Sequence, residues 1–335
     1  MPRTARLDTP GLLHHVMIRG IERRRIFKDK EDRQNFIDRL AILPPETKTK
    51  CYAWAFMPNH AHFLFRSGLP GISTLMRRLL TGYAVSFNRR YKRHGQLFQN
   101  RYKSIICQED AYLKELVRYI HLNPLRANLV ADLKALDRYP FCGHSALMGE
   151  KRYQWQDIKY VLGFYGTKIG AARKKYRAYV EQGIAVGRRP ELVGGGLIRS
   201  LGGWDEVKNM RLTGQERIKS DQRILGESNF VQDVLSESEE NLTRKYKLKR
   251  LGFDFEKVVE KVALIFQLEK EYITAKGRQK ERVQARDLAC YWSSVELGIS
   301  MANLSEKLGM TIAAVSYAVI RGSNVAQKRG YQLAD

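Results

Sequence analysis

The fold is decided by the stretch TKCYAWAFMPNHAHFLFR, residues 49–66. Two runs rich in apolar and aromatic residues, 49–56 and 60–66, flank the tripeptide Met-Pro-Asn. Proline and asparagine are frequent in turns, and short apolar runs bounded by turn residues are typical of strands. The stretch therefore predicts a β-hairpin whose second strand carries His60 and His62.

Outward from this hairpin, the chain alternates between strand-like and helix-like patterns. The flanking elements expected from periodicity are strands at 12–18 and 101–107 and helices at 29–43, 72–91 and 110–122. Strands and helices combined with a hairpin favour a small α+β fold over a doubly wound parallel sheet.

The chain is strongly basic. Its 335 residues include 59 Lys and Arg against 35 Asp and Glu, which gives a formal net charge of +24. Residues 47–108 contain eleven basic side chains and no acidic one. A surface without carboxylates does not repel phosphates, so the backbone of a nucleic acid is expected to lie along this stretch. The alternative is a basic protein that its charge keeps in solution.

Other features of the composition narrow the class of protein. A hydrophobic share of 44% with 28% charged residues is ordinary for a globular protein. No apolar run approaches the ~18 residues of a membrane helix, and the N-terminus has no apolar signal core. The four cysteines are widely separated, which argues against a zinc ribbon and fits a reducing compartment. We expect a cytoplasmic, nucleoid-associated protein with no membrane partner.

Length and patterning predict three regions. Residues 1–148 mix strands and helices, residues 149–235 read as helices with loops, and residues 236–335 are helical. A glycine-rich stretch at 187–204 lacks the Lys-Ser or Lys-Thr of a phosphate loop and is interpreted as a connector. The acidic and polar segment 236–241, followed by basic residues, predicts a linker at the last boundary.

His60 and His62 form the most informative motif of the first region. In a strand, side chains two positions apart lie on the same face. Two imidazoles at that spacing can bind one divalent cation, provided that a third ligand converges from elsewhere. The alternative is a structural pair that binds no metal, which is the commoner origin of a His-x-His motif.

The segment ELVRYIHLNPLRANLV offers a partner for the two histidines. Tyr119 and Asn123 are four residues apart, on one face of a helix. An amide oxygen from Asn123 can complete a metal site while the Tyr119 phenol lies beside it. The chemistry would then be phosphoryl transfer, with the phenol attacking a backbone phosphate. Spacing alone does not separate Tyr119 from Tyr102 or Tyr112.

Three stretches, MPNHAHFLF, GQLFQNRYKS and RYIHLNPLRANLV, together resemble the REP-associated tyrosine transposases, a branch of the single-tyrosine HUH transposases. The segment GLLHHVMIRGIERRRIFKDKED is similar to that family's first strand and Arg-Gly turn, so the resemblance covers residues 7–147. It implies a ferredoxin-like antiparallel sheet with the histidine pair on a central strand. It also implies cleavage and transfer of single-stranded, hairpin-forming DNA through a 5′-phosphotyrosine, with magnesium or manganese as cofactor.

The resemblance implies a role for each matching residue. Tyr119 matches the nucleophile, His60 and His62 match the metal-binding pair, and Asn123 matches the third ligand, where other branches carry Gln. Ala61 is smaller than the bulky residue usual between the histidines. The competing hypothesis is a sequence-specific DNA-binding or regulatory protein that retains the fold without the activity. The choice between a monomer and a homodimer stays open.

Basic side chains on or beside the strands nearest this site are expected to contact nucleic acid. These are Arg19, Arg23, Arg24, Arg101 and Lys103. The alternation of charge and aromatic ring at 101–103 suits both phosphate contacts and base stacking. The alternative is a solvated strand face. His14 and His15 are interpreted as structural residues, and His121 as pointing away from the Tyr119 face.

Near the C-terminus, GISMANLSEKLGMTIAAVSYAVIRG fits a helix-turn-helix with Gly309 at its turn. Residues 277–322 resemble the DNA-binding domain of the bacterial replication initiator. The Asp-His-Thr usual in that domain is absent, so its binding sequence is not carried over. The second helix is expected to begin near Thr311 and to expose four side chains to DNA, namely Thr311, Ser316, Tyr317 and Arg321.

Overall fold

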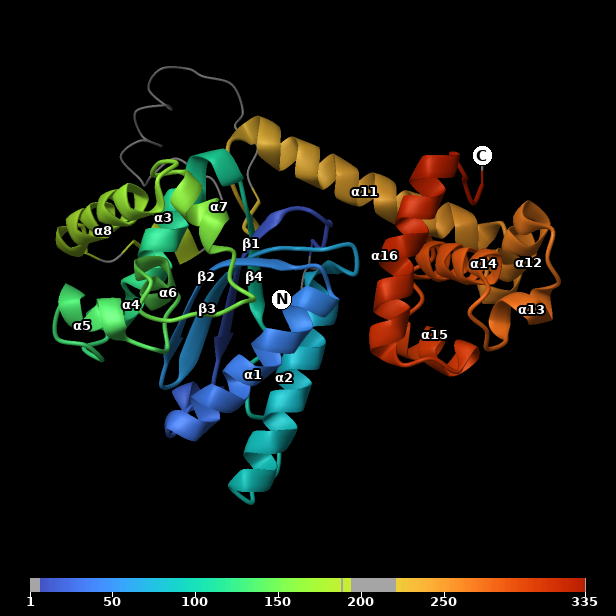
Figure 1. Ribbon diagram of the computed structural model, residues 1–335. Helices are drawn as coiled ribbons and strands as arrows, with labels where there is room; N and C mark the ends of the chain where they lie inside the picture. Colours follow the sequence, from blue (N-terminus) through green and yellow to red (C-terminus); the bar gives the residue numbers. More distant parts are fainter. Residues whose placement is uncertain (1–6, 188, 194–220, 335) are drawn as a thin grey trace. The chain divides into compact units, whose positions relative to one another are not determined.

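The computed structural model describes residues 7–187, 189–193 and 221–334 (Figure 1). They divide into two compact units: the first comprises the residues up to Gly68 and Ile72–Val234, and the second comprises Leu69–Gly71 and the residues from Leu235 onward. The elements of the first unit are, in chain order, β1 (Leu13–Arg19), a 3₁₀ turn (Ile21–Arg23), α1 (Lys30–Glu46), β2 (Lys50–Met57), β3 (His60–Arg66), α2 (Gly71–Arg90), β4 (Lys103–Cys107), α3 (Glu109–His121), α4 (Asn123–Arg126), α5 (Leu133–Arg138), α6 (His144–Met148), α7 (Ile158–Gly163), α8 (Ile169–Ala185), a second 3₁₀ turn (Pro190–Val193) and β5 (Ile224–Leu225).

The α+β prediction is confirmed, and the strand order is β2-β3-β1-β4-β5. The first four strands are antiparallel and are interleaved with α1 and α2 in the ferredoxin-like order. The predicted hairpin is β2–β3, and β3 lies between β2 and β1. One strand departs from the expected antiparallel sheet, because β5 pairs in parallel with the outer edge of β4.

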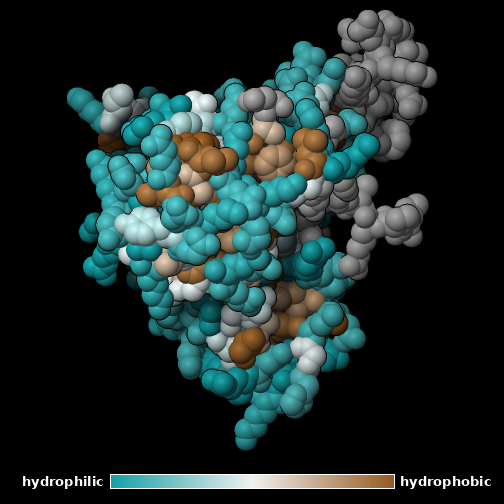
Figure 2. Space-filling model, turned by 90° about the vertical axis from the view of Figure 1, so that its right-hand side faces the viewer, coloured by the Kyte–Doolittle hydropathy of each residue, from teal (hydrophilic) through white to brown (hydrophobic). Residues whose placement is uncertain are grey.

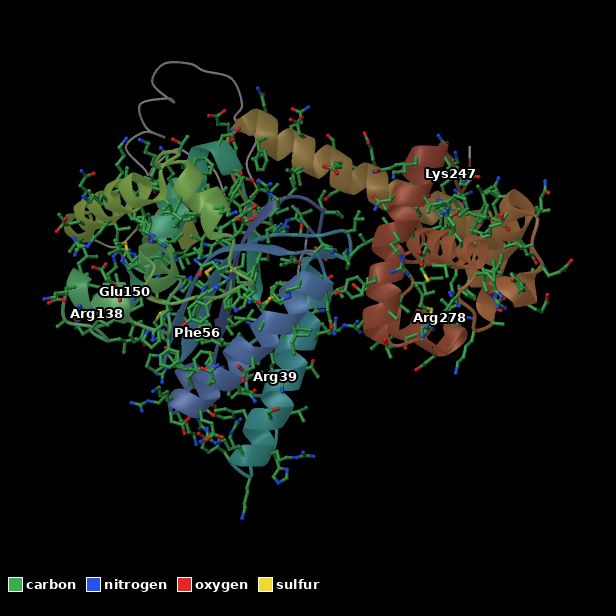
Figure 3. All side chains as sticks on the ribbon, viewed as in Figure 1. Arg39, Phe56, Arg138, Glu150, Lys247 and Arg278 are labelled. Atoms are coloured by element: carbon green, nitrogen blue, oxygen red, sulfur yellow. The ribbon has the colours of Figure 1, made fainter. Side chains whose placement is uncertain are left out.

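One face of the sheet is covered by α1 and α2. Aromatic rings fill this layer: Phe56 stacks on Phe27 with ring centroids 4.9 Å apart and meets Phe36 edge-on (Figure 3). Leu79 and Tyr83 of α2 pack into the same core. Apolar residues at helical spacing on both helices therefore cover the alternating apolar positions of the strands.

The other face of the sheet carries α3 and the helices that follow it. Leu116 and Ile120 of α3 pack with Leu64 of β3 and with Tyr176 and Val180 of α8. This core is continuous across residue 148, where the sequence predicted a boundary between the first region and a connector. The glycine-rich stretch predicted at 187–204 lies mostly outside the described residues.

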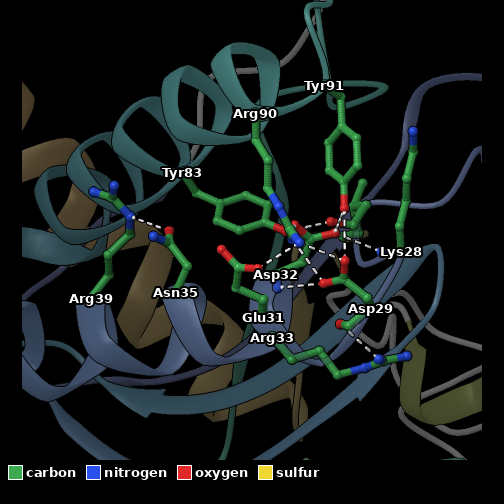
Figure 4. Close-up of polar contacts among 11 residues, drawn as sticks. Lys28, Asp29, Glu31, Asp32, Arg33, Asn35, Arg39, Tyr83, Arg90 and Tyr91 are labelled. Carbon is green, nitrogen blue, oxygen red and sulfur yellow. Dashed lines mark hydrogen bonds and ion pairs between the residues drawn. The ribbon is translucent and has the colours of Figure 1, made fainter.

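The N-terminus of α1 and the C-terminus of α2 are held together by a group of charged side chains, called here the Arg90 cluster (Figure 4). Arg90 contacts the carboxylates of Asp29, Glu31 and Asp32 at 2.6–2.8 Å. Asp29 also caps α1 by accepting from the backbone N–H of Asp32. Tyr91 donates to the nearly buried Asp32 carboxylate at 2.9 Å. The two helix ends are thereby fixed over the sheet.

The second unit is helical, and α11 (Ser228–Arg250) contains the boundary where the sequence predicted a linker. The other elements are α12 (Phe255–Phe266), α13 (Lys270–Thr274), α14 (Lys280–Tyr291), a π-helical turn (Trp292–Glu296), α15 (Met301–Leu308) and α16 (Ile312–Arg329). The expected turn at Gly309 has a left-handed backbone with φ 58°, and Thr311 caps α16 by accepting from Ala314 N–H.

α16 packs closely against α14 through small side chains. A Cβ added to Gly322 would lie 1.9 Å from the backbone oxygen of Asp287. Ser316 and Ser323 lie on the same side of α16 and are buried. The prediction that Ser316 is exposed is therefore wrong, because Ser316 belongs to the stripe of small residues that α16 turns toward α14.

The molecular surface in Figure 2 is mainly hydrophilic, with hydrophobic side chains in several separate patches. No helix in the described part of the chain combines the length and apolar character needed to cross a bilayer.

Candidate active site

The β2–β3 turn is tightly bound to the loop that follows β1. The Pro58 carbonyl accepts from the backbone N–H groups of Ile26 and Phe27 at 2.9 and 3.0 Å, and the Asn59 carbonyl accepts from Gly20 N–H at 2.9 Å. The Asn59 side chain also donates to the Arg23 carbonyl at 3.1 Å. The first residues of β3 therefore start from a fixed position.

His60 and His62 lie on the same face of β3, the face that α3 covers. Their ring centroids are 5.4 Å apart. On the neighbouring strand, Arg19 lies opposite His60 and Met17 lies opposite His62. The expectation that the two imidazoles share a face is thus met by the strand geometry.

Tyr119 is the tyrosine that lies beside this pair. Its ring centroid is 5.8 Å from that of His62, edge to face. Tyr102, which spacing alone left as an alternative, packs in the α1–α2 layer on the opposite face of the sheet. Tyr112 is on α3 two turns before Tyr119, and no described ring contact joins it to either histidine.

Asn123 is placed by the break between α3 and α4. Pro124 has no backbone N–H, so the Ile120 carbonyl lacks its usual helical donor. The Asn123 side-chain Nδ2 takes that place, donating to the carbonyls of Tyr119 at 2.9 Å and Ile120 at 3.3 Å. Because carbonyl oxygens only accept, the amide nitrogen faces the helix end and Oδ1 is presented on the other side.

A third histidine, His15 of β1, also belongs to this site. Its ring centroid is 5.2 Å from His62 and 5.9 Å from Tyr119. His15 Nε2 and His62 Nδ1 are 2.9 Å apart, and His15 Nδ1 is 2.9 Å from the Leu192 carbonyl oxygen. The sequence predicts only a structural role for His15, and the structure places it between the candidate site and the 3₁₀ turn at Pro190–Val193.

Burial keeps these imidazoles uncharged. It lowers the pKa of His15 and of His60 to about 4, with the Arg19 charge adding to the effect at His60. Burial also lowers the pKa of His62 far below its ordinary value, helped by the neighbouring His15 and His60. Near neutral pH all three rings are therefore neutral, the form in which imidazole ligates metals.

A small pocket borders Tyr119 on the side of α8. Arg118, Arg126 and Arg189 line it, together with Glu115. The guanidinium carbon of Arg126 lies 5.6 Å from the Tyr119 ring centre, and its Nε and Nη1 are buried without a hydrogen-bond partner among the described residues. Glu115 pairs with Arg118 at 2.6 Å and Arg189 at 3.3 Å, so the pocket has an excess of positive charge.

The predicted nucleic-acid contacts of the first unit fall in different places. Arg19 is exposed on the face of the sheet that carries His60. Lys103 is opposite Met17 on the same face, and its ammonium group donates to the Val193 carbonyl at 2.7 Å. Arg24 pairs with Glu22 at 2.7 Å, and both side chains are exposed. Arg23, in the 3₁₀ turn that follows β1, has an exposed side chain, and so does Arg101, in the loop that precedes β4.

The predicted contacts of the second unit are partly engaged within that unit. Tyr317 and Thr311 are exposed, whereas Ser316 is buried. Arg321 forms a bidentate ion pair with the buried Asp287 carboxylate at 2.6 and 2.8 Å. Its guanidinium group therefore has a structural partner.

The three candidate ligands predicted from the sequence are His60, His62 and Asn123. The described part of the chain holds no group of three His, Cys, Asp or Glu side chains placed to bind a metal. His60 and His62 supply two neutral imidazoles on one face of β3, and Asn123, the first residue of α4, presents its amide oxygen away from the end of α3. Imidazole nitrogen is a common ligand of zinc, copper, iron and nickel, and carbonyl oxygen is a common ligand of magnesium, calcium and manganese.

His15, Asn59 and Arg126 were not found as site residues from the sequence. Asn59 directly precedes His60, and Arg126 lies seven residues after Tyr119, beyond the break between α3 and α4. These spacings could have drawn attention to both. For His15 no local spacing was available, because its position depends on how β1 pairs with β3.

Comparison with known proteins gives one family match and one similar solved structure. Residues 9–123 match a family model described as transposase IS200 like, and all of His60, His62, Tyr119 and Asn123 lie within the match. The solved structure of a REP-associated tyrosine transposase bound to a REP hairpin is similar at 17% identity, with a TM-score of 0.36. The similarity covers 46% of this chain and 91% of that chain. No curated protein matches the chain.

Proposed function

Because residues 9–123 match the IS200-like transposase family, we propose that the first unit cleaves single-stranded DNA and transfers the cut strand through a covalent tyrosine intermediate. The observation that carries the proposal is the placement of the Tyr119 ring 5.8 Å from His62, on the face where the two histidines lie. Hairpin-forming DNA is the proposed substrate, since the related transposase was solved with a REP hairpin.

In the proposed reaction the Tyr119 oxygen attacks a backbone phosphorus. A P–O bond to the phenol forms and the P–O3′ bond breaks, which leaves a 5′-phosphotyrosine and a free 3′-hydroxyl. The phenol loses its proton to solvent, and the departing 3′ oxygen takes one up. Attack by another 3′-hydroxyl reverses these bonds and releases Tyr119, so strand transfer needs no external energy source.

His60, His62 and Asn123 would hold a magnesium or manganese ion. When bound, such an ion polarises the phosphate and stabilises charge that develops on its oxygens. The positive charge of Arg126 beside the Tyr119 ring favours the ionised phenol. Arg19, which shares the sheet face with His60, is placed to contact the DNA backbone.

The second unit is proposed to assist DNA recognition. α15 and α16 are joined by a short turn, and Thr311 and Tyr317 are exposed at the start of α16. A helix that exposes its first turns can enter the major groove. The basic composition of the chain supports contact with DNA phosphates by both units.

The test is to incubate the full-length protein with labelled hairpin DNA and manganese and to look for a protein–DNA adduct under denaturing conditions. Tyr119→Phe removes only a hydroxyl, so DNA binding should persist while the adduct disappears. Tyr112→Phe, on the same helix, is the matched control and should form the adduct normally. Peptide mapping should locate the DNA on Tyr119. An adduct formed by Tyr119→Phe, or one mapped to another tyrosine, would refute the mechanism, and DNA binding without any adduct would favour the non-catalytic alternative.

A further inference from the structure

His15 and Asn59 contact the two candidate metal ligands from behind. His15 is fully buried and joins His62 to the Leu192 carbonyl through contacts of 2.9 Å on both of its ring nitrogens. Asn59 joins His60 to the Arg23 carbonyl, with its Oδ1 2.7 Å from His60 Nδ1 and its Nδ2 3.1 Å from the carbonyl oxygen. Each chain of hydrogen bonds therefore ends at a backbone carbonyl.

A carbonyl oxygen can only accept a hydrogen bond, and this fixes the direction of the first chain. His15 Nδ1 must carry the hydrogen that it donates to Leu192. In a neutral ring the other nitrogen, Nε2, then has no hydrogen and accepts from His62 Nδ1. His62 consequently carries its hydrogen on Nδ1, and its Nε2 presents a lone pair.

The same reasoning applies to the second chain. The Arg23 carbonyl requires the Asn59 amide nitrogen, so Asn59 Oδ1 faces His60 and accepts from His60 Nδ1–H. His60 Nε2 is then also without a hydrogen. Among the described residues, the hydrogen bonds of His60 and His62 use their Nδ1 atoms and leave both Nε2 atoms without a partner. Both lone pairs are therefore available on the face shared with Tyr119.

The backbone that anchors the second chain is itself unusual. Glu22 and Arg23 both have left-handed backbones, with φ of 51° and 59°. Such conformations cost energy for residues other than glycine and persist where the surroundings hold them. Here they turn the Arg23 carbonyl toward the Asn59 side chain, which a straight continuation of β1 would not do.

We propose that His15 and Asn59 are positioning residues, which hold His62 and His60 in the Nδ1–H tautomer so that both Nε2 atoms are ready to bind a divalent cation. The inference rests on the proposed metal site. A neutral histidine in the other tautomer carries a hydrogen where the cation must bind, so an unsupported ring would have to exchange that hydrogen first. Partners behind metal-ligating histidines commonly contribute about 10–100-fold to metal affinity.

The first experiment needs no substitution. Long-range ¹H–¹⁵N correlation spectra of the full-length, metal-free protein, labelled at histidine nitrogens, distinguish the two neutral tautomers. Histidine-to-glutamine variants at 60 and 62 assign the signals. Both rings should show the Nδ1–H pattern near neutral pH. An Nε2–H pattern at either ring would overturn the proposal for that ring, whatever the cleavage activity of the protein.

The second experiment measures manganese affinity by electron paramagnetic resonance. His15→Phe keeps an aromatic ring but removes the chain of hydrogen bonds, and should weaken manganese binding by about 10-fold or more. His15→Gln can donate to Leu192 and accept from His62, so it should restore most of the affinity. Neither the tautomer spectra nor the manganese affinity depends on DNA cleavage. Both can therefore be interpreted even if the protein proves not to cleave DNA.

The matched control is His14→Phe. His14 is as buried as His15 and is adjacent on β1, but it hydrogen-bonds to Ser104 at 3.1 Å and faces the other side of the sheet. Manganese affinity should remain unchanged in this variant. Equal losses in His14→Phe and His15→Phe, or no loss in His15→Phe with the spectra showing mixed tautomers, would show that His15 only fills space.

Discussion

Arg126 lies beside the proposed nucleophile, with its guanidinium carbon 5.6 Å from the Tyr119 ring centre. Burial lowers the pKa of Arg126, yet the group stays protonated at any ordinary pH. In the proposed mechanism, a positive charge at this position would favour the phenolate during attack and also when the phosphotyrosine is broken. Two of its buried nitrogens can in addition donate to a phosphate oxygen.

We predict that Arg126→Met reduces the rate of adduct formation by about tenfold or more, because transition-state stabilisation is lost while the fold is kept. Arg126→Lys should recover part of the rate, since it restores the charge without the planar group. Single-turnover cleavage at saturating DNA is the measurement. The exposed Arg138 on α5 (Figure 3) provides the control, and Arg138→Met should cleave at the wild-type rate. Equal rates for Arg126→Met and Arg138→Met would exclude the role of Arg126.

At this scale the sequence predicted what depends on local spacing. The period of two in a strand placed His60 and His62 on one face, and the helical period placed Tyr119 and Asn123 together. It did not predict His15, because the contact with His62 requires the register of β1 against β3. Register depends on the whole sheet, and residues 47 positions apart carry no local signal of it.

At the scale of elements, the Arg90 cluster joins α1 to α2 and is sensitive to pH. Chiefly through its hydrogen bonds to Arg90, the pKa of the Asp29 carboxyl is held well below its ordinary value of 3.8. A carboxyl whose pKa is depressed in the folded state stabilises the fold above its unfolded pKa and loses that contribution as the pH falls through the folded pKa.

Arg90→Met should therefore destabilise the first unit most near neutral pH. The difference in the free energy of unfolding between variant and wild type should shrink as the pH falls below 3.8. Urea unfolding followed by circular dichroism at several pH values measures this. Arg89→Met, next in sequence with an exposed side chain, is the control and should leave the midpoint unchanged. A difference that stays constant into acid would mean that Arg90 acts through packing and not through its charge.

The contact between α14 and α16 gives a second prediction for an element. Gly322→Ala places a Cβ against the Asp287 backbone, where neither helix can yield without moving the other. Overpacking of this kind typically costs about 1–3 kcal/mol. Differential scanning calorimetry should show a lower unfolding temperature for the second unit. Gly330→Ala, where a Cβ would meet no atom, serves for comparison, although its left-handed φ of 67° adds a small cost.

The ends of elements were harder to predict than their existence. The helix expected at 29–43 was predicted to stop before Pro44, yet α1 runs to Glu46. A proline backbone angle is compatible with a helix, and only the hydrogen bonds to the preceding turn are lost. The end is set instead by Thr47, which donates from its backbone and hydroxyl to the Leu43 carbonyl. The prediction that Ser316 is exposed failed for a related reason. Which face of α16 is buried depends on its packing against α14, and the sequence of α16 alone does not show this.

For the whole molecule, two units with separate cores allow binding and cleavage to be separated. Val231 and Val234 at the start of α11 are buried, so a fragment ending at residue 235 keeps them. We predict that this fragment cleaves single-stranded DNA at a rate near that of the full chain but discriminates less between its own site and unrelated hairpins. Competition binding measures the discrimination. Raising the salt concentration should weaken DNA binding by both proteins, with a steep slope of the logarithm of the binding constant against the logarithm of the salt concentration. Equal discrimination by fragment and full chain would remove the second unit from target recognition.

Pro124 has a consequence for the electrical charge of the site. Because it removes the usual helical donor to the Ile120 carbonyl, the side-chain N–H of Asn123 donates to the carbonyls of Tyr119 and Ile120, and an aspartate at this position would set its oxygens against both carbonyls. The candidate ligand at this position is therefore an amide, which carries no charge. With two uncharged imidazoles as the other ligands, a divalent ion held here would keep its full double positive charge toward the DNA. In the proposed site, a hydrogen-bond donor missing from the backbone would thus determine how strongly the metal centre attracts a polyanion.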